Sequence, residues 1–446
     1  MGLTEGIRDL TDRVGWIHRT AGGGRIGAGR LKVSEHEIAL EVPLDDGIGA
    51  ALGVSTGWLS SGEAVVPERL VFIDHDGWVG LEGCRVRRSN YRVFSELTPW
   101  VEIHADYAVE MQGLDEDFWN LSGVRSEIAG LAGWTGLSSL HSQVTRNDDG
   151  LLKSVDVTAN SPSAVEIGTD YGLKLVPHFT ATGSRSNGTF LLKQHVYVQT
   201  STAQPESFDH HAEVHQSMQD LLTVAYGTGC GLRVESASSA RHPLTAPRTG
   251  KVIGEKWRDV VAVWHGRGNP DAPTELPSDS WPLFTLADIG TDGVRRWIEE
   301  VDDWIRVVGP LSSSCFQTSV VIELHVMQTA VSLEALGYRI ALRRNKIEPG
   351  GSLAFPQYLR LIADSLDCDL ASVLRGDPAN GVARFDDFSG WADAFNDVYR
   401  QAKHADHPLP DSIRASVLAK SGSLLVRLWL AREFGVSAAE LEKNVH

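Results

Sequence analysis

The chain is short of cysteine, of long apolar runs and of basic residues. Its 446 residues include four cysteines, and no two of them form a CxxC pair. This pattern supports neither a zinc ribbon nor a disulfide scaffold, and sparse thiols are typical of a reducing cytosol. The N-terminus has no apolar run of signal-peptide length, and no stretch supplies the roughly 18 apolar residues of a membrane span. The sequence therefore predicts a cytoplasmic protein with no membrane partner.

Acidic residues outnumber basic ones. Lys and Arg total 41, Asp and Glu total 58, and the formal net charge is −17. Proteins that coat nucleic acid through bulk charge need a basic surface, so the balance argues against that class. The negative net charge still allows a small basic site on an otherwise acidic protein. The hydrophobic content of 42% is enough for sizeable cores, and the length predicts two or three domains.

The first half of the sequence has the pattern of β-strands. Apolar and polar residues alternate over short segments, and turn residues such as those at 147–150 separate the segments. Many short strands spaced by turns predict a β-sandwich or barrel-like domain. One helix, at 207–227 with Ser207 or Asp209 as its N-cap, interrupts the strands. The expected strands lie at 30–44, 70–86, 100–111, 151–159, 188–201 and 251–266.

A proline-rich segment at 267–283 separates the strands from a helical region. Beyond it, apolar residues recur at spacings of three and four, the pattern of amphipathic helices. The first expected helix starts near Asp292 and stops at Gly309-Pro310. A central one follows at about 316–342, and others lie near 355–366, 386–405 and 411–434. The predicted class is α+β, with a β-rich, sandwich-like domain at 1–270 and an all-α bundle at 285–446.

Three candidate sites have simpler explanations. Gly22, Gly24 and Gly27 match GxGxxG, but a strand is expected after them where a dinucleotide site needs a helix, so a loop is favoured. His211 and His215 lie four apart on a helix, as a metal pair could, but no HExxH motif is present. Solvated histidines on a polar helix face are favoured there.

A group of arginines follows Gly83, and it could contact phosphate or an acidic partner. Pairing with some of the many carboxylates is the favoured interpretation. The group consists of Arg85, Arg87, Arg88 and Arg92.

The strongest candidate is the segment YRQAKHADHP at 399–408. Arg400, Lys403 and His404 share one helical face, and Pro408 predicts that the helix ends at about His407. Simple capping of a helix C-terminus is the alternative explanation. An arginine can stabilise phosphate oxygens and a histidine can act as a base near neutral pH. Together they could support RNA cleavage by the 2′-hydroxyl without a metal or other cofactor.

This segment resembles the motif region of the HEPN superfamily (higher eukaryotes and prokaryotes nucleotide-binding), whose members are helical bundles. The order of a β-rich domain and then a helical one resembles ApeA-type anti-phage proteins, as does LSGVRSEIAGLAGWTGLSSL at 121–140. In the motif, an arginine is followed by a polar residue and, further on, by a histidine. Arg400 matches the arginine and Gln401 the polar residue. Six residues separate Arg400 from His407, which is the upper limit of the motif spacing. Three residues separate Arg400 from His404, one fewer than usual, so His407 is favoured as the catalytic histidine.

The resemblance implies a metal-independent RNA endonuclease. RNA, with tRNA as one candidate, would be the substrate, with Gln401 and Lys403 as binding residues. Two subunits would join through the helical domain, as a homodimer or within a higher oligomer, and form one composite cleft. The β-rich domain would sense a phage-derived trigger. Two alternatives stay open: a HEPN-like dimer that binds RNA or nucleotide without cleaving it, and a β-sandwich recognition protein whose helices only oligomerise.

Overall fold

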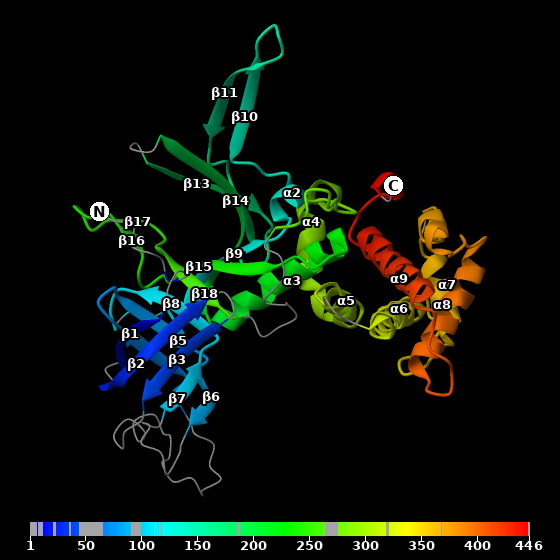
Figure 1. Ribbon diagram of the computed structural model, residues 1–446, viewed down its shortest axis with the longest axis horizontal. Helices are drawn as coiled ribbons and strands as arrows, with labels where there is room; N and C mark the ends of the chain where they lie inside the picture. Colours follow the sequence, from blue (N-terminus) through cyan, green and yellow to red (C-terminus); the bar gives the residue numbers. More distant parts are fainter. Residues whose placement is uncertain are drawn as a thin grey trace, which may run out of the picture.

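A computed structural model of the chain describes residues 7, 12–20, 24–34, 37–43, 66–90, 100–114, 116, 118–184, 188–263, 275–317, 321–366 and 368–444. The N-terminal part is built on an antiparallel sheet of 14 strands (Figure 1). In pairing order these are β12 (Val165–Glu166), β13 (Lys174–Ser184), β14 (Thr189–Glu206), β9 (Leu121–Ile128), β15 (Leu232–Ser238), β18 (Trp257–Ala262), β8 (Tyr107–Met111), β5 (Trp78–Glu82), β4 (Arg69–Ile73), β1 (Arg13–Arg19), β2 (Arg25–Ser34), β3 (Glu37–Pro43), β7 (Trp100–His104) and β6 (Arg85–Asn90).

Two short hairpins stand apart from this sheet. One pairs β10 (Leu140–Arg146) with β11 (Leu152–Ala159), and the other pairs β16 (Leu244–Thr245) with β17 (Val252–Gly254). The hairpin of β10 and β11 projects well beyond the rest of the molecule (Figure 1).

The strands of the first hundred residues gather around a core of their own. Ile38, Leu40 and Val42 alternate along β3 and are buried, and Leu40 pairs with the buried Leu31 of β2. Residues at every second position share one face of a strand, which explains the alternation. The single strand expected at 30–44 is in fact parts of two paired strands, since β2 ends at Ser34 and β3 starts at Glu37.

Helix α3 (Phe208–Tyr226) covers one face of the other half of the sheet, where it contacts β9, β14 and β15. Ser207 caps it as predicted, because its hydroxyl accepts a hydrogen bond from the backbone N–H of His210 at 3.3 Å. Val214 and Met218 of α3 are buried in one cluster with Val196 and Val198 of β14. The helix is thus fixed on the sheet by its apolar stripe.

The C-terminal part is helical, which confirms the α+β class. Helix α6 is central, as expected, because it contacts α5, α7, α8 and α9. No helix among the described residues has the length and apolar character needed to cross a membrane. The helices besides α3 are α2 (Leu131–Thr135), α4 (Leu286–Glu299), α5 (Val301–Cys315), α6 (Ile322–Arg343), α7 (Phe355–Ala363), α8 (Phe388–Lys403), α9 (Ser412–Glu433) and α10 (Ala438–Asn444), with 3₁₀ turns η2 (Leu370–Ser372) and η3 (Pro378–Asn380).

The helix expected from Asp292 to Gly309 starts close to the predicted residue but ends differently. Helix α4 is interrupted at Gly290, whose φ of 65° and ψ of 176° are not helical, so its main part begins just before Asp292. A capping box of Thr285 and Asp288 starts the short turn that precedes this kink. The helix is interrupted at Glu300, and α5 then continues through Pro310 to Cys315. Proline removes only one backbone donor, and the buried side chains around it keep α5 packed against α6.

Candidate functional site

Helix α8 carries the Arg400 segment and is held firmly in the bundle. The Asp387 side chain caps its N-terminus by accepting from the backbone N–H of Gly390 at 2.7 Å. Its apolar face buries Trp391 and Phe395, and the indole of Trp391 donates to Ser421 Oγ of α9 at 2.8 Å. These contacts fix the direction in which the last turn of α8 points.

The helix ends at Lys403, one turn before His407. His404 is the C-cap residue with an extended backbone, and its N–H donates to the carbonyl of Arg400 at 3.0 Å. A turn follows, in which the N–H of His407 donates to the carbonyl of His404 at 3.1 Å. The two imidazole rings therefore lie side by side, with centroids 6.2 Å apart. A turn, rather than one continuous helical face, brings His407 to the cluster.

The cationic side chains of this cluster face solvent. Arg400, Lys403 and His404 are exposed, whereas Gln401 and His407 are half-buried. Lys403 Nζ donates to Tyr399 Oη at 3.2 Å, and this hydrogen bond, with a smaller contribution from Glu334, raises the lysine pKa. No ion pair or hydrogen bond engages the Arg400 guanidinium within the described part of the chain. One permanent cation is thus left available beside two imidazoles.

This arrangement has the groups needed for acid–base chemistry on a phosphodiester. An exposed guanidinium can bind two phosphate oxygens at once, and imidazoles exchange protons near neutral pH. No acidic side chain pairs with these groups in the described structure, so their charge stays available to an anion.

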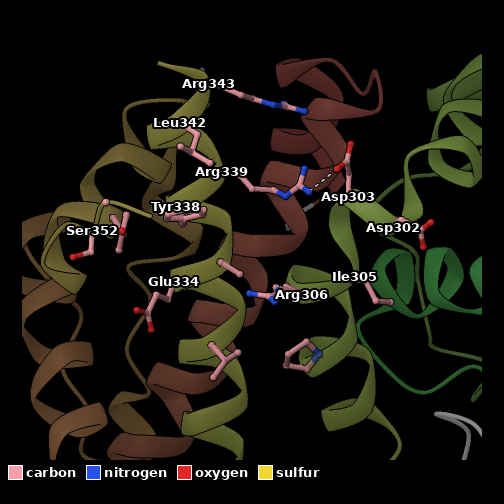
Figure 2. A pocket seen from close by; sticks show the side chains of 15 residues that line it. Asp302, Asp303, Ile305, Arg306, Glu334, Tyr338, Arg339, Leu342, Arg343 and Ser352 are labelled. Carbon is pink, nitrogen blue, oxygen red and sulfur yellow. Dashed lines mark hydrogen bonds and ion pairs between the residues drawn. The ribbon is translucent and has the colours of Figure 1, made fainter. Parts of the chain in front are cut away.

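A cavity of about 950 Å³, which no local sequence pattern indicates, lies between α5 and α6 (Figure 2). Figure 2 shows Arg339 of α6 beside Asp303 of α5, and this ion pair spans 2.7 Å. Glu334 also lines the cavity and is the same carboxylate that contributes to the raised Lys403 pKa. The cavity is formed by residues from separate helices, so only their packing could reveal it.

His211 and His215 are completely buried, which corrects the expectation of solvated histidines. His211 Nε2 donates to the carbonyl of Leu121 at 3.2 Å, so its Nδ1 accepts from the Thr200 hydroxyl at 2.8 Å. His215 Nε2 then donates to the Thr200 oxygen at 3.1 Å. The sheet covers this face of α3, which the helical period alone could not indicate. Burial lowers the pKa of His215 to about 3.

The histidines of α3 thus form a neutral hydrogen-bonded chain inside the core. Both nitrogens of His211 and Nε2 of His215 are engaged within it. They form no metal pair in this arrangement.

The other candidates resolve mostly as structural features. Gly27 lies within β2, opposite Ile17 of β1, so a strand follows the glycines as expected, while Gly22 lies outside the described residues. Arg85 pairs with Asp106 at 2.7 Å and Arg87 with Glu37 at 3.5 Å.

The remaining members of the arginine group differ from these two. Arg88 is exposed on β6, and Arg92 lies outside the described residues. Pairing with carboxylates therefore accounts for Arg85 and Arg87, as favoured, and leaves Arg88 in solvent.

Two acid–histidine groups among the described residues have the spacing of a metal site, and the less exposed one consists of Glu37, Glu102 and His104. Ligand atoms of Glu37, Glu102 and His104 lie within 4.8 Å of one another. However, His104 Nε2 is 2.7 Å from Glu102 Oε1, and Arg87 Nη1 is 3.2 Å from His104 Nδ1. These hydrogen bonds occupy both ring nitrogens, and the neighbouring arginine disfavours a cation.

Comparison with known proteins bears on the N-terminal part of the chain. The family model for ApeA N-terminal domain 1 matches residues 27–297. The chain belongs to this family. The match starts in β2, contains the 121–140 segment and ends within α4, which confirms the ApeA resemblance. Membership supports a role in anti-phage defence. No curated protein and no solved structure matches the chain.

Proposed function

We propose that the chain is a metal-independent RNA endonuclease of an anti-phage defence system. The observation that carries the proposal is the exposed, unengaged Arg400 at the end of α8, beside the adjacent rings of His404 and His407. The HEPN-like motif lies beyond residue 297, so it adds to the ApeA family match and does not follow from it.

The chemistry is an attack of the RNA's own 2′-hydroxyl on the adjacent phosphorus. His407 takes the hydroxyl proton, and His404 gives a proton to the departing 5′-oxygen or holds the substrate. Arg400 stabilises the extra negative charge of the phosphorane. The P–O5′ bond breaks as the P–O2′ bond forms, so the products are a 2′,3′-cyclic phosphate and a 5′-hydroxyl. Gln401 and Lys403 bind the flanking RNA, with tRNA as one candidate substrate.

The proposed enzyme works as a homodimer, or within a higher oligomer, through its helical region. Leu409 and Ile413, just after the histidines, are 76% and 44% exposed. Large apolar side chains in this position are suited to burial by a second copy. Two copies would also bring two sets of cations together, which offsets the acidic net charge of −17 locally.

The β-rich part, at 1–270, is proposed to sense a phage-derived trigger in the cytoplasm and to control a nuclease domain at 285–446. Hydrogen bonds between the β-rich part and the helical part support these two roles. Arg427 of α9 donates from Nε to the carbonyl of Val224 at 2.6 Å and from Nη2 to that of Ala225 at 2.8 Å, both in the last turn of α3. A shift of α3 on its sheet would therefore act directly on α9.

The test is cleavage of total cellular RNA by the purified full-length chain in EDTA, alone and with extract of phage-infected cells. Arg400→Ala and the double variant His404→Ala/His407→Ala are expected to lose at least about a hundredfold in rate. Arg414→Ala, an exposed arginine at the start of α9, is the matched control and should cleave like wild type. Equal cleavage by all variants would place the site elsewhere.

A non-cleaving RNA-binding dimer is the second candidate. It is favoured by the end of α8 at Lys403, which puts both histidines off the helix that carries Arg400. RNA binding that depends on Arg400, with no product even when extract of infected cells is present, would identify this alternative.

A further inference from the structure

The sheet under α3 has an opposite face that joins none of the hydrophobic cores among the described residues. Along β14, Val196 and Val198 point toward α3, so His195 and Tyr197 point the other way. On β9 the same alternation buries Val124 and turns Arg125 to this opposite face, here called the outer face.

Aromatic and cationic side chains form a continuous row across the outer face. The guanidinium carbon of Arg125 lies 3.8 Å from the Trp257 ring centroid of β18 and 5.9 Å from that of Tyr197. The Tyr197 ring is 5.7 Å from His195 and nearly parallel to it, at 8°. His178 of β13 follows at 5.9 Å from Tyr197. The row crosses four interstrand spacings, or about 19 Å.

A glycine lets the first member of this row lie against the sheet. A Cβ on Gly123 of β9 would come within 3.0 Å of the Trp257 ring and 2.8 Å of the Thr200 carbonyl oxygen. The indole therefore occupies the space above the glycine, and its own face supports Arg125.

The guanidinium of Arg125 can hold an anion on this face. Its Nε donates to Gln199 Oε1 at 2.8 Å, and no ion pair to a carboxylate is formed in the part of the chain that is described. Burial lowers the pKa of Arg125 and the charge of Glu255 opposes this, so the group remains cationic. Of the nearby acids, Glu127 already accepts from His195 and, at 2.8 Å, from Arg233.

We propose that the outer face binds single-stranded RNA, with bases stacked on Tyr197 and on the exposed His178 and a phosphate at Arg125. Aromatic rings next to a cation on the face of a sheet are suited to unpaired bases and their backbone. Exposed Lys193 extends the positive charge along β14. RNA is preferred over DNA because the Ser236 hydroxyl lies opposite Arg125 in register and can bond a 2′-hydroxyl. This inference is independent of the nuclease site, which is on another part of the chain.

The experiment measures fluorescence anisotropy of a short labelled oligouridylate with the full-length Arg400→Ala chain, which leaves the probe intact. In that background, Tyr197→Ala and Arg125→Ala should each weaken binding about tenfold or more, because each removes a stacking or phosphate contact. Lys193→Ala, on an exposed and fold-neutral position, should weaken it severalfold. The control Arg146→Ala changes an exposed arginine of β10 and should leave binding unchanged.

Several outcomes would overturn the inference. They are the absence of oligouridylate binding, equal binding by the Lys193 and Tyr197 variants and their parent, or equal affinity for the matching oligodeoxyuridylate. Cleavage in EDTA by the wild-type chain is measured separately, so failure of this proposal and failure of the nuclease proposal are distinguished.

Discussion

At the scale of single residues, the core of this protein contains imidazoles that must stay neutral. Thr200 donates to His211 and accepts from His215, which leaves His215 Nδ1 without a partner among the described residues. A buried imidazole cannot be protonated without loss of this arrangement and a large desolvation cost. The pair therefore makes stability depend on pH.

We expect acid to destabilise the fold partly through His215. Its pKa is about 3 in the folded chain and near 6.5 when unfolded. Below 6.5 the unfolded chain takes up a proton that the folded chain does not, so stability is full above this pH and falls toward pH 3. Between pH 7 and pH 5 the loss is about 2 kcal/mol.

Urea unfolding at these two pH values measures this dependence. His215→Gln, which keeps a donor for Thr200, should flatten it by that amount. The exposed His75→Gln is the control and should keep the wild-type dependence. An unchanged pH dependence in His215→Gln would show that this histidine does not resist protonation.

At the scale of elements, the contact between α3 and α9 depends on one side chain. Arg427 is half-buried, and desolvation of its guanidinium lowers its pKa to about 10, so it keeps its charge at neutral pH. Its two hydrogen bonds satisfy carbonyls at the C-terminus of α3, where helix carbonyls lack intrahelical partners.

Arg427→Leu should lower the free energy of unfolding by about 1–3 kcal/mol, because the buried Val224 carbonyl loses its donor, while the Ala225 carbonyl keeps the backbone N–H of Leu283. Urea unfolding at neutral pH, with Arg414→Ala of the same helix as control, measures the change. A loss no greater than that of the control would mean that water replaces the guanidinium at no cost.

The loop that carries the histidines is bounded by a second cap. Asp411 accepts from the backbone N–H of Arg414 at 2.8 Å and so starts α9. Asp411→Ala should cost about 1 kcal/mol of stability. If the loop geometry positions His407, Asp411→Ala should lower the rate of RNA cleavage by more than this loss of stability explains. Asp411→Asn should retain both the cleavage rate and the stability. Unchanged cleavage in the alanine variant would separate the cap from the site.

Local patterns allowed several elements to be predicted, and long-range packing explains the failures. Ser207 as a cap and the apolar face of α8 follow from neighbours in the sequence. Burial of His211 and His215 does not, because it depends on which face of α3 the sheet covers. The cavity at Glu334 and the row at Arg125 also join separate elements, and the continuation of α5 through Pro310 depends on its contact with α6.

At the scale of the whole molecule, an acidic chain is proposed to act on RNA through small cationic regions. Leu409→Asp should convert the proposed dimer to monomer, because it places charge in the apolar contact. Sedimentation measures the change, and Leu151→Asp, at a 65% exposed position beside β11, is the control. RNA cleavage should fall along with dimer content. A wild-type chain that is monomeric when it cleaves RNA would contradict the composite cleft.

Arg400 and the histidines beside it are proposed to cleave RNA by 2′-hydroxyl attack. The most direct measurement is the chemistry of the product ends formed in EDTA by the full-length chain, with extract of infected cells where activation requires it. We expect 2′,3′-cyclic phosphate and 5′-hydroxyl ends with wild type, and none with Arg400→Ala or with His404→Ala/His407→Ala. Products ending in 5′-phosphate, cleavage that requires a metal, or cyclic ends that persist in both variants would contradict it.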